Sequence, residues 1–136
     1  MRRRDSEYLA MARRGFLATS RNNKATVIPV CFAHHGDIVY TPIDRKPKRK
    51  HLARLSNITS NPHVAFLVDN YSEDWRLLSY LLMHGNASMV SNTREARRAR
   101  ELLLHKYPQY RWLKLGEAPI LGIQVQRSKF WQFQSD

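Results

Sequence analysis

Positively charged side chains gather in one short stretch of the sequence, TPIDRKPKRKHLARL, at residues 41–55. The stretch leads from the expected end of a strand into the expected start of a helix, where free backbone N–H groups and the helix dipole favour an anion. Its partner could be a single phosphate, a track of nucleic-acid phosphates or plain solvent. Its cations are Arg45, Lys46, Lys48, Arg49, Lys50 and Arg54.

No self-sufficient catalytic motif accompanies these cations. The sequence contains no HExxH, no Gly-rich phosphate loop and no G-x-S-x-G, and we predict no catalytic side chain. The histidines lack the spacing of metal ligands, so we predict no metal site either. If the protein is an enzyme, a bound cofactor would therefore carry the reaction. The histidines are His34, His35, His51, His63, His84 and His105.

The composition limits the number of domains and the class of partner. A chain of 136 residues, 43% of them hydrophobic, can bury one core, so we expect one domain over residues 1–136. Lys and Arg number 23 against 11 Asp and Glu, and the formal charge of +12 favours phosphates, polyglutamates or nucleic acids as partners. The single cysteine, Cys31, excludes a disulfide framework, and we expect it in the core.

The sequence shows no sign of a membrane segment. No apolar run reaches the roughly 18 residues that a membrane span needs. The charged start MRRRDSEYLAMA lacks the continuous apolar segment of a signal peptide. We therefore expect a cytoplasmic protein without a membrane partner.

The first third of the chain predicts a helix followed by a three-stranded meander. Ser6 is placed to cap the helix, with Leu9 and Met11 on its apolar side. Three antiparallel strands are expected within residues 15–41, separated by turn residues. Pro29 cannot donate to a strand ladder, so it predicts an edge position or a bulge.

The remainder of the chain predicts more strands and two helices. Asn92 is placed to cap the second of these helices, with Glu95 at capping-box spacing, and Pro108 ends it. Its apolar positions recur at helical intervals, at Ala96, Ala99, Leu103 and Tyr107. The other expected elements are a helix at 52–58 and strands at 61–69, at 77–90 with a break near Gly85, at 121–126 and at 129–133.

Nucleic-acid binding is a weaker hypothesis for the positive charge than a site for a single phosphate. The arginines at 94–100 and at 2–4 could extend the basic stretch into a phosphate track. Single-strand binding also needs aromatic side chains in a row. The aromatic residues here are dispersed singly, which is more typical of core or interface positions: Tyr40, Tyr80, Trp75, Trp112 and Trp131.

Four motifs in one order resemble a known superfamily. They are IPVCFA at 28–33, DRKPKR at 44–49, LARLSNI at 52–58 and VDNYSEDW at 68–75. With a final FWQ they resemble the pyridoxamine 5′-phosphate oxidase-like FMN-binding split β-barrel proteins, over nearly the whole chain. Within that superfamily the motifs are most similar to the probable coenzyme F420-dependent oxidoreductases.

The resemblance implies a fold and a cofactor site. The fold would be mainly β (α+β), a six- to seven-stranded antiparallel split β-barrel with two or three flanking helices. The protein would be a homodimer with two cofactor sites at the subunit interface, for coenzyme F420 (a deazaflavin) or FMN. The ring would lie along the second strand, at Ala25, Thr26, Val27 and Ile28. The phosphate would be held by Tyr40, Thr41, Lys46, Lys48 and Arg54.

The resemblance also implies an activity. The leading hypothesis is an oxidoreductase that passes a hydride between coenzyme F420 and a small unsaturated or quinone-like substrate, with Trp75 and Arg76 at the rim of the substrate pocket. One alternative is an FMN flavoprotein, an oxidase or a reductase. Another is a non-catalytic module that binds flavin or nucleic acid. Haem handling would suit the fold, with His84 and His105 as nominal axial ligands.

Overall fold

The computed structural model describes residues 1–43, 49–113 and 115–134, with backbone alone for residues 49–54. The described helices are α1 (Arg3–Met11), α2 (Arg49–Ser60) and α3 (Thr93–Lys106), with 3-10 turns η1 (Trp75–Leu77) and η2 (Pro108–Arg111). The described strands are β1 (Gly15–Arg21), β2 (Lys24–Val30), β3 (Ala33–His35), β4 (Ile38–Pro42), β5 (His63–Asn70), β6 (Ser79–Met89) and β7 (Ile120–Gln132).

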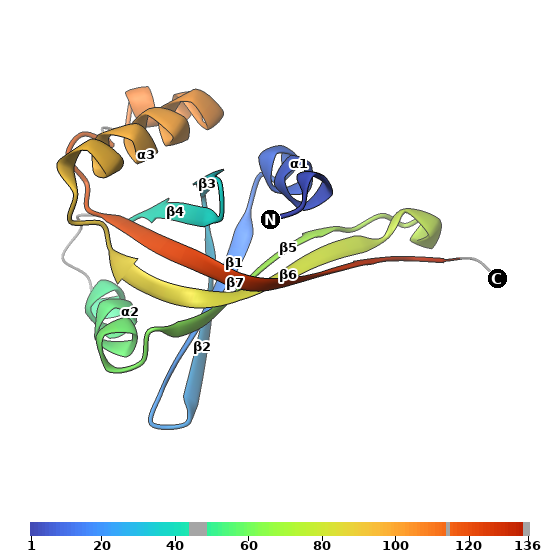
Figure 1. Ribbon diagram of the computed structural model, residues 1–136, viewed down its shortest axis with the longest axis horizontal. Coiled ribbons are helices and arrows are strands. Elements are labelled where there is room, and N and C mark those ends of the chain that lie inside the picture. The colour runs from blue at the N-terminus through green and yellow to red at the C-terminus, as the bar shows by residue number, and fades with distance from the viewer. Residues whose placement is uncertain (44–48, 114, 135–136) are drawn as a thin grey trace.

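The seven strands form one antiparallel sheet in the order β2-β1-β5-β6-β7-β4-β3 (Figure 1). The two edge strands, β2 and β3, follow each other in the chain, with only Cys31 and Phe32 between them. The sheet must therefore curl until its edges approach, which is the geometry of a partly open barrel. Seven strands and three flanking α-helices confirm the predicted α+β split barrel.

The inner face of the curled sheet carries the core. Strand alternation turns one side chain in two inward, and the largest fully buried side chains of this cluster include Phe32, Phe66 and Met83. Gly15 is required beside Phe66, because a Cβ at this position would lie 2.2 Å from the ring. A second cluster joins α3 to β4 and β7 through Tyr40, Ala99, Leu103 and Ile120.

The N-terminal helix starts earlier than predicted. It begins at Arg3, so Ser6 lies within it, and the Ser6 hydroxyl instead forms a 2.8 Å hydrogen bond with His34 Nε2. The buried carboxylate of Asp5 accepts a 3.1 Å hydrogen bond from Ser128 Oγ on β7. Leu9 is buried as predicted, but Met11 is 81% exposed. Contacts with distant strands, which local sequence does not contain, place this helix.

The predicted three-stranded meander contains four strands, because the chain leaves the ladder at residues 31–32. Thr41 Oγ1 donates a 2.8 Å hydrogen bond to the Cys31 carbonyl, and the Phe32 N–H donates to the Tyr107 hydroxyl at 3.2 Å. Side chains thus replace the missing strand partners. Cys31 is exposed, so the prediction of a core thiol was wrong. Pro29 lies in edge strand β2, as predicted.

The later elements match the predictions except at the C-terminal strand. Asn92 Oδ1 accepts a 3.0 Å hydrogen bond from the Glu95 N–H, which confirms the cap of α3. The ladder between β6 and β7 shifts register between His84 and Gly85, at the predicted break. The two strands predicted at 121–126 and 129–133 are one strand of 13 residues, β7.

Lys106 at the end of α3 connects three segments of the inner side. Its ammonium group donates a 3.0 Å hydrogen bond to the Leu9 carbonyl of α1 and lies 3.8 Å from the centre of the Phe32 ring. Arg13 donates to the Lys106 carbonyl at 2.9 Å. Burial, with the nearby charge of Arg13 adding to it, lowers the pKa of Lys106 to about 8. None of the described helices combines the length and apolar character that crossing a bilayer would need.

The lowered pKa of Lys106 predicts a pH dependence of stability. The folded value of about 8 lies below the ordinary value of 10.5, so between these values the unfolded chain holds a proton that the folded chain has lost. Folding is therefore favoured more as the pH rises through this window. We expect the stability of the wild type relative to Lys106→Met to increase from about pH 7 to about pH 10, in denaturant titrations of both proteins. An equal difference at both pH values would contradict this assignment.

Candidate functional site

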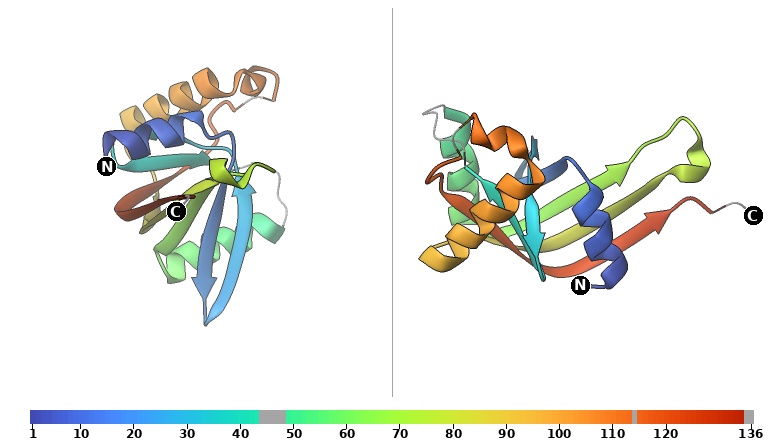
Figure 2. Two further views of the ribbon diagram at one scale, coloured as in Figure 1. Left: turned by 90° about the vertical axis from the view of Figure 1, so that its right-hand side faces the viewer. Right: turned by 90° about the horizontal axis from the view of Figure 1, so that it is seen from above.

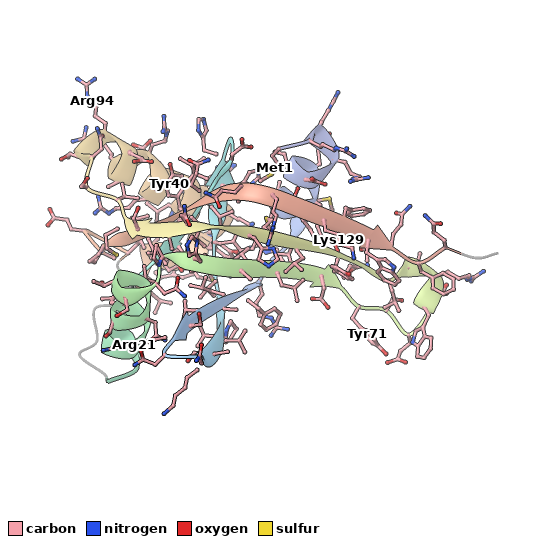
Figure 3. All side chains as sticks on the ribbon, turned by 60° about the horizontal axis from the view of Figure 1, so that its bottom comes forward. Met1, Arg21, Tyr40, Tyr71, Arg94 and Lys129 are labelled. Carbon is pink, nitrogen blue, oxygen red and sulfur yellow. The ribbon has the colours of Figure 1, made fainter. Side chains whose placement is uncertain are left out.

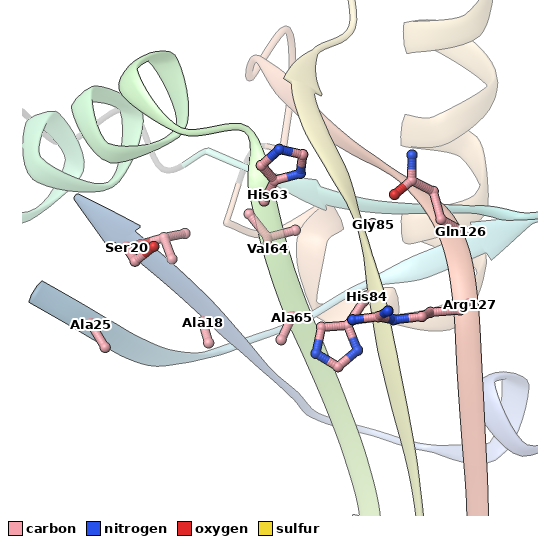
Figure 4. Close-up of a pocket in the computed structure, with 11 residues that line it drawn as sticks. Ala18, Ser20, Ala25, His63, Val64, Ala65, His84, Gly85, Gln126 and Arg127 are labelled. Carbon is pink, nitrogen blue, oxygen red and sulfur yellow. The ribbon is translucent and has the colours of Figure 1, made fainter. Parts of the chain in front are cut away.

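An open groove of about 670 Å³ lies on the outer face of the sheet, the face turned away from the core (Figure 4). This volume is within the usual range for small-molecule sites. Strands β1, β2, β5, β6 and β7 all contribute to its walls. The side chains that define it are Ala18, Ser20, Ala25, His63, Ala65, His84, Gln126 and Arg127.

Small side chains keep the floor of the groove open. On β1, Leu17 and Thr19 are buried inward, so alternation turns Ala18 outward. Ala65 of β5 pairs with Ala18 and points to the same face. With Ala25 from β2, these methyl groups leave a flat apolar surface across three neighbouring strands. Such a surface suits a planar ring.

Polar and basic side chains line the other side of the groove. His84 on β6 and Arg127 on β7 are direct cross-strand partners, and Figure 4 shows both side chains projecting from neighbouring strands. His63 stands at the end of β5, nearer to α2. No Asp or Glu is among the described residues that line the groove. The charge balance therefore favours an anionic or electron-rich ligand.

A bulge in β7 aims two of these side chains. His84 pairs with Arg127 and Gly85 pairs with Val125, so Gln126 has no partner of its own. The extra residue lets neighbours Gln126 and Arg127 both line the groove, although successive residues of a regular strand point to opposite faces. Gly85 is required here, because its Cβ would lie 2.1 Å from the Gln124 carbonyl oxygen.

The close approach at Gly85 gives a stability prediction. We expect Gly85→Ala to destabilise the fold by about 2–3 kcal/mol, because backbone atoms of β7 must move to admit the methyl group. Gly122→Ala on the facing strand is the matched control. Its Cβ would lie 3.2 Å from the Val90 side chain, which can yield, so its cost should stay below about 1 kcal/mol. Chemical denaturation measures both, and equal costs would contradict the bulge assignment.

A buried acceptor without a partner lies beside the groove. Asn86 pairs with His63 across the β5–β6 ladder and follows His84 by two residues, so it belongs to the same face. Its Oδ1 is the one buried side-chain N or O atom, among the described residues, with no hydrogen-bond partner. Such a group costs free energy unless it is satisfied. Asn86 is not among the described residues that line the groove, so a groove ligand would reach this oxygen only after the side chain moved.

Two of the four residues predicted to follow the cofactor ring lie on the outer face of β2. Ala25 lines the groove, and Val27, paired with Ala18, is 64% exposed on the same face. Thr26 and Ile28 have the opposite parity, and Ile28 packs against the core. Strand β2 has a single neighbour in the described sheet, so the backbone groups along its other edge are free to meet a ligand.

Of the five residues predicted to hold the phosphate, the two whose side chains the structure describes do not line the groove. Tyr40 and Thr41 are buried in β4, and their hydroxyls donate 2.8 Å hydrogen bonds to Glu95 Oε2 and to the Cys31 carbonyl. Burial, with Glu95 adding to it, raises the pKa of Tyr40. Lys46 and Lys48 lie outside the described residues, as does the side chain of Arg54. Phosphate binding by all five stays a prediction.

The residues predicted for the substrate pocket lie at the far end of the sheet. Trp75 and Arg76 belong to η1, at the tip of the β5–β6 hairpin (Figure 1). This tip follows the last residue of β5, whereas His63 is its first residue. Trp75 is 62% exposed, and Arg76 forms a 2.9 Å ion pair with Asp74. Neither lines the groove of its own chain. Their role stays a prediction that requires a second chain.

A second hollow, of about 410 Å³, occupies the outer face near this hairpin. Tyr80 and Trp131 stack at 5.5 Å between ring centres, next to Leu67 and Leu82, and all four are partly exposed. The outer face is thus apolar at one end and basic at the other. No group of three or more His, Cys, Asp or Glu among the described residues could hold a metal ion.

Sequence reasoning missed the groove residues Ser20, His63 and Arg127. Among the polar groove residues, His84 alone had been named as a candidate ligand, for haem, and the other haem candidate, His105, is exposed on α3. The available signal was the outward parity of Ser20 with Ala18 and the break near Gly85. Neither tells which residue of a distant strand lies opposite.

The chain matches the family model of pyridoxamine 5′-phosphate oxidase over residues 4–128. It belongs to that family. Solved structures share the fold. A FAD-binding protein from Mesorhizobium loti is 15% identical with a TM-score of 0.70, covering 96% of this chain and 94% of its own. No curated protein matches the sequence.

Two further structures extend this likeness of fold. A conserved protein of unknown function from Corynebacterium diphtheriae is 24% identical, with a TM-score of 0.69 and coverage of 98% of this chain and 96% of its own. The haem storage protein HutZ from Vibrio cholerae is 15% identical, with a TM-score of 0.71 and coverage of 97% and 95%. The family match confirms the resemblance to the superfamily and these structures confirm the fold, while the F420-dependent branch stays a prediction.

Proposed function

We propose that this protein binds a phosphorylated flavin or deazaflavin in the outer-face groove and acts as an oxidoreductase. The observation that carries the proposal is the groove itself, which combines a flat alanine floor with Arg127 and two histidines and has no carboxylate among its described lining residues. Membership of the pyridoxamine 5′-phosphate oxidase family supports it. So does the shared fold with the FAD-binding protein from Mesorhizobium loti.

The residues present fit such a cofactor. Ala18, Ala25 and Ala65 would lie against the face of a planar ring, and the free edge of β2 would offer backbone hydrogen bonds. Arg127 would neutralise negative charge on the ring or its tail.

Coenzyme F420 is the cofactor that we place first, with FMN as the alternative. Residues 45–50 hold five Lys or Arg beside the start of α2, and this charge suits a tail that carries carboxylates as well as a phosphate. When bound and reduced, the ring would supply a hydride to a small unsaturated or quinone-like substrate. The chain would orient both reactants and exclude water, without a nucleophilic side chain.

We also propose a homodimer joined through the outer faces. Leu67, Leu82, Tyr80 and Trp131 leave an apolar surface beside the groove that a second copy would cover. A two-fold axis perpendicular to the strands and parallel to the faces would lay the hairpin end of one protomer over the groove of its partner. Trp75 and Arg76 of the partner subunit would then form the substrate rim.

Cofactor binding is tested by fluorescence titration of the purified protein with coenzyme F420, FMN and FAD. We expect saturable binding, tightest for coenzyme F420, and a loss of about tenfold or more in Arg127→Ala. Arg97→Ala removes the same charge from an exposed position on α3 and should leave affinity unchanged. Equal losses in both variants would mean that net charge, and not the groove, holds the cofactor.

The dimer is tested by sedimentation equilibrium. Leu82→Lys places a charge at the middle of the apolar outer face, and we expect a monomer that keeps the wild-type circular dichroism spectrum. Met11→Lys is the control, because Met11 is equally apolar and 81% exposed on the helical side. A Leu82→Lys protein with the wild-type mass would refute this interface.

A further inference from the structure

An exposed apolar pair stands on the helical side of the molecule. Trp112 and Leu113 follow η2 and are 79% and 74% exposed. The turn that presents them is firmly anchored, because Leu115 is buried against α3 and the Leu115 N–H donates to the Tyr110 carbonyl at 3.3 Å. The Ala118 carbonyl accepts hydrogen bonds from the Arg100 guanidinium at 3.1 and 3.2 Å. An anchored turn thus holds two large apolar side chains out of the core.

Cations without carboxylate partners lie beside this pair in the chain and on helix α3. Residues 93–118 contain seven Lys or Arg and three Glu. Arg111 directly precedes Trp112, and Arg94 and Arg97 are exposed on α3, which packs against η2. In the described part of the chain, none of these three arginines forms a salt bridge. Figure 3 shows Arg94 extending away from the sheet.

This surface is separate from the groove. Helices α1 and α3 lie on the side of the sheet opposite to the β1–β2 hairpin, which borders the groove (Figures 1 and 2). The exposed Arg13 belongs to the same side, because its guanidinium donates a hydrogen bond to the Lys106 carbonyl at the end of α3. The helical side therefore carries an excess of positive charge together with a protruding apolar pair.

We propose that this surface docks the protein onto a bilayer that contains anionic phospholipids. Trp112 and Leu113 would enter the boundary between headgroups and acyl chains, a depth that Trp favours. Arg94, Arg97 and Arg111 would lie among the headgroup phosphates. The expectation of no membrane partner came from the lack of a spanning segment, and surface docking requires none.

The same features argue against other occupants. A nucleic-acid site gains from aromatic rings on which bases stack, whereas Leu113 offers an aliphatic side chain that would remain in water. A second copy of this chain would bring its own unpaired arginines against these, which costs free energy. An anionic lipid surface satisfies both the charge and the aliphatic side chain.

The test is co-sedimentation of the full chain with vesicles of phosphatidylcholine alone or mixed with phosphatidylglycerol. We expect binding to the mixed vesicles only, weakened by added salt, and reduced about tenfold or more in the double variant Trp112→Ala with Leu113→Ser. The matched control is Trp75→Ala with Leu77→Ser, which removes a similar exposed pair, 62% and 59% exposed, from the hairpin tip. It should bind vesicles like the wild type.

Three results would overturn the proposal. The first is wild-type protein that stays in the supernatant with mixed vesicles. The second is equal binding by both double variants, which would leave charge alone as the cause. The third is a lower oligomer mass for Trp112→Ala with Leu113→Ser in sedimentation equilibrium, which would make this surface a protein interface. Circular dichroism of each variant is the control for folding. The cofactor titration tests the groove, so its outcome does not depend on any of these three results.

Discussion

The pairing of β6 with β7 is the constraint on which the rest of the structure depends. The ladder runs from Ser79 opposite Gln132 to Met89 opposite Leu121, with a single shift at Gly85. Before the shift, Ile123 points to the core. After it, Phe130 packs against the core while Trp131 stacks on Tyr80 at the outer face. One extra residue therefore exchanges the two faces of β7, and both the core and the groove are built on that exchange.

The same exchange explains why the C-terminal strand was predicted as two. Apolar alternation holds from Leu121 to Val125 and resumes at Phe130 with the opposite parity, so a search for period two finds an interruption. The bulge was visible in the sequence only as the break near Gly85. Elements whose signals are local, such as the capped helix α3, were predicted correctly. Ser6 and Cys31 were misplaced because tertiary contacts outweigh the local pattern at both positions.

The candidate site shows a sharper limit of the sequence. Ala25 was named because the family resemblance places the cofactor ring along the second strand, and only parity separates it from Thr26 and Ile28. A groove assembled from five strands depends on the register between segments far apart in the chain, as the pairing of His84 with Arg127 illustrates. Tyr40 and Thr41 show that nearness to the basic stretch in the sequence does not reveal a side chain's partners. Their hydroxyls donate to Glu95 and to the Cys31 carbonyl. Hydroxyl groups in a core need partners, and these two find theirs within the fold.

The two sides of the sheet would impose different geometries on binding. A dimer joined through its outer faces encloses both grooves, so each cofactor would be sheltered by the other chain. The helical sides of such a dimer face away from each other, and a flat bilayer could meet only one of them. Lipid contact would then rest on one apolar pair and a few arginines, which gives weak and reversible attachment. The formal charge of +12 would serve both proposed sites, with Arg127 in the groove and Arg94, Arg97 and Arg111 on the helical side.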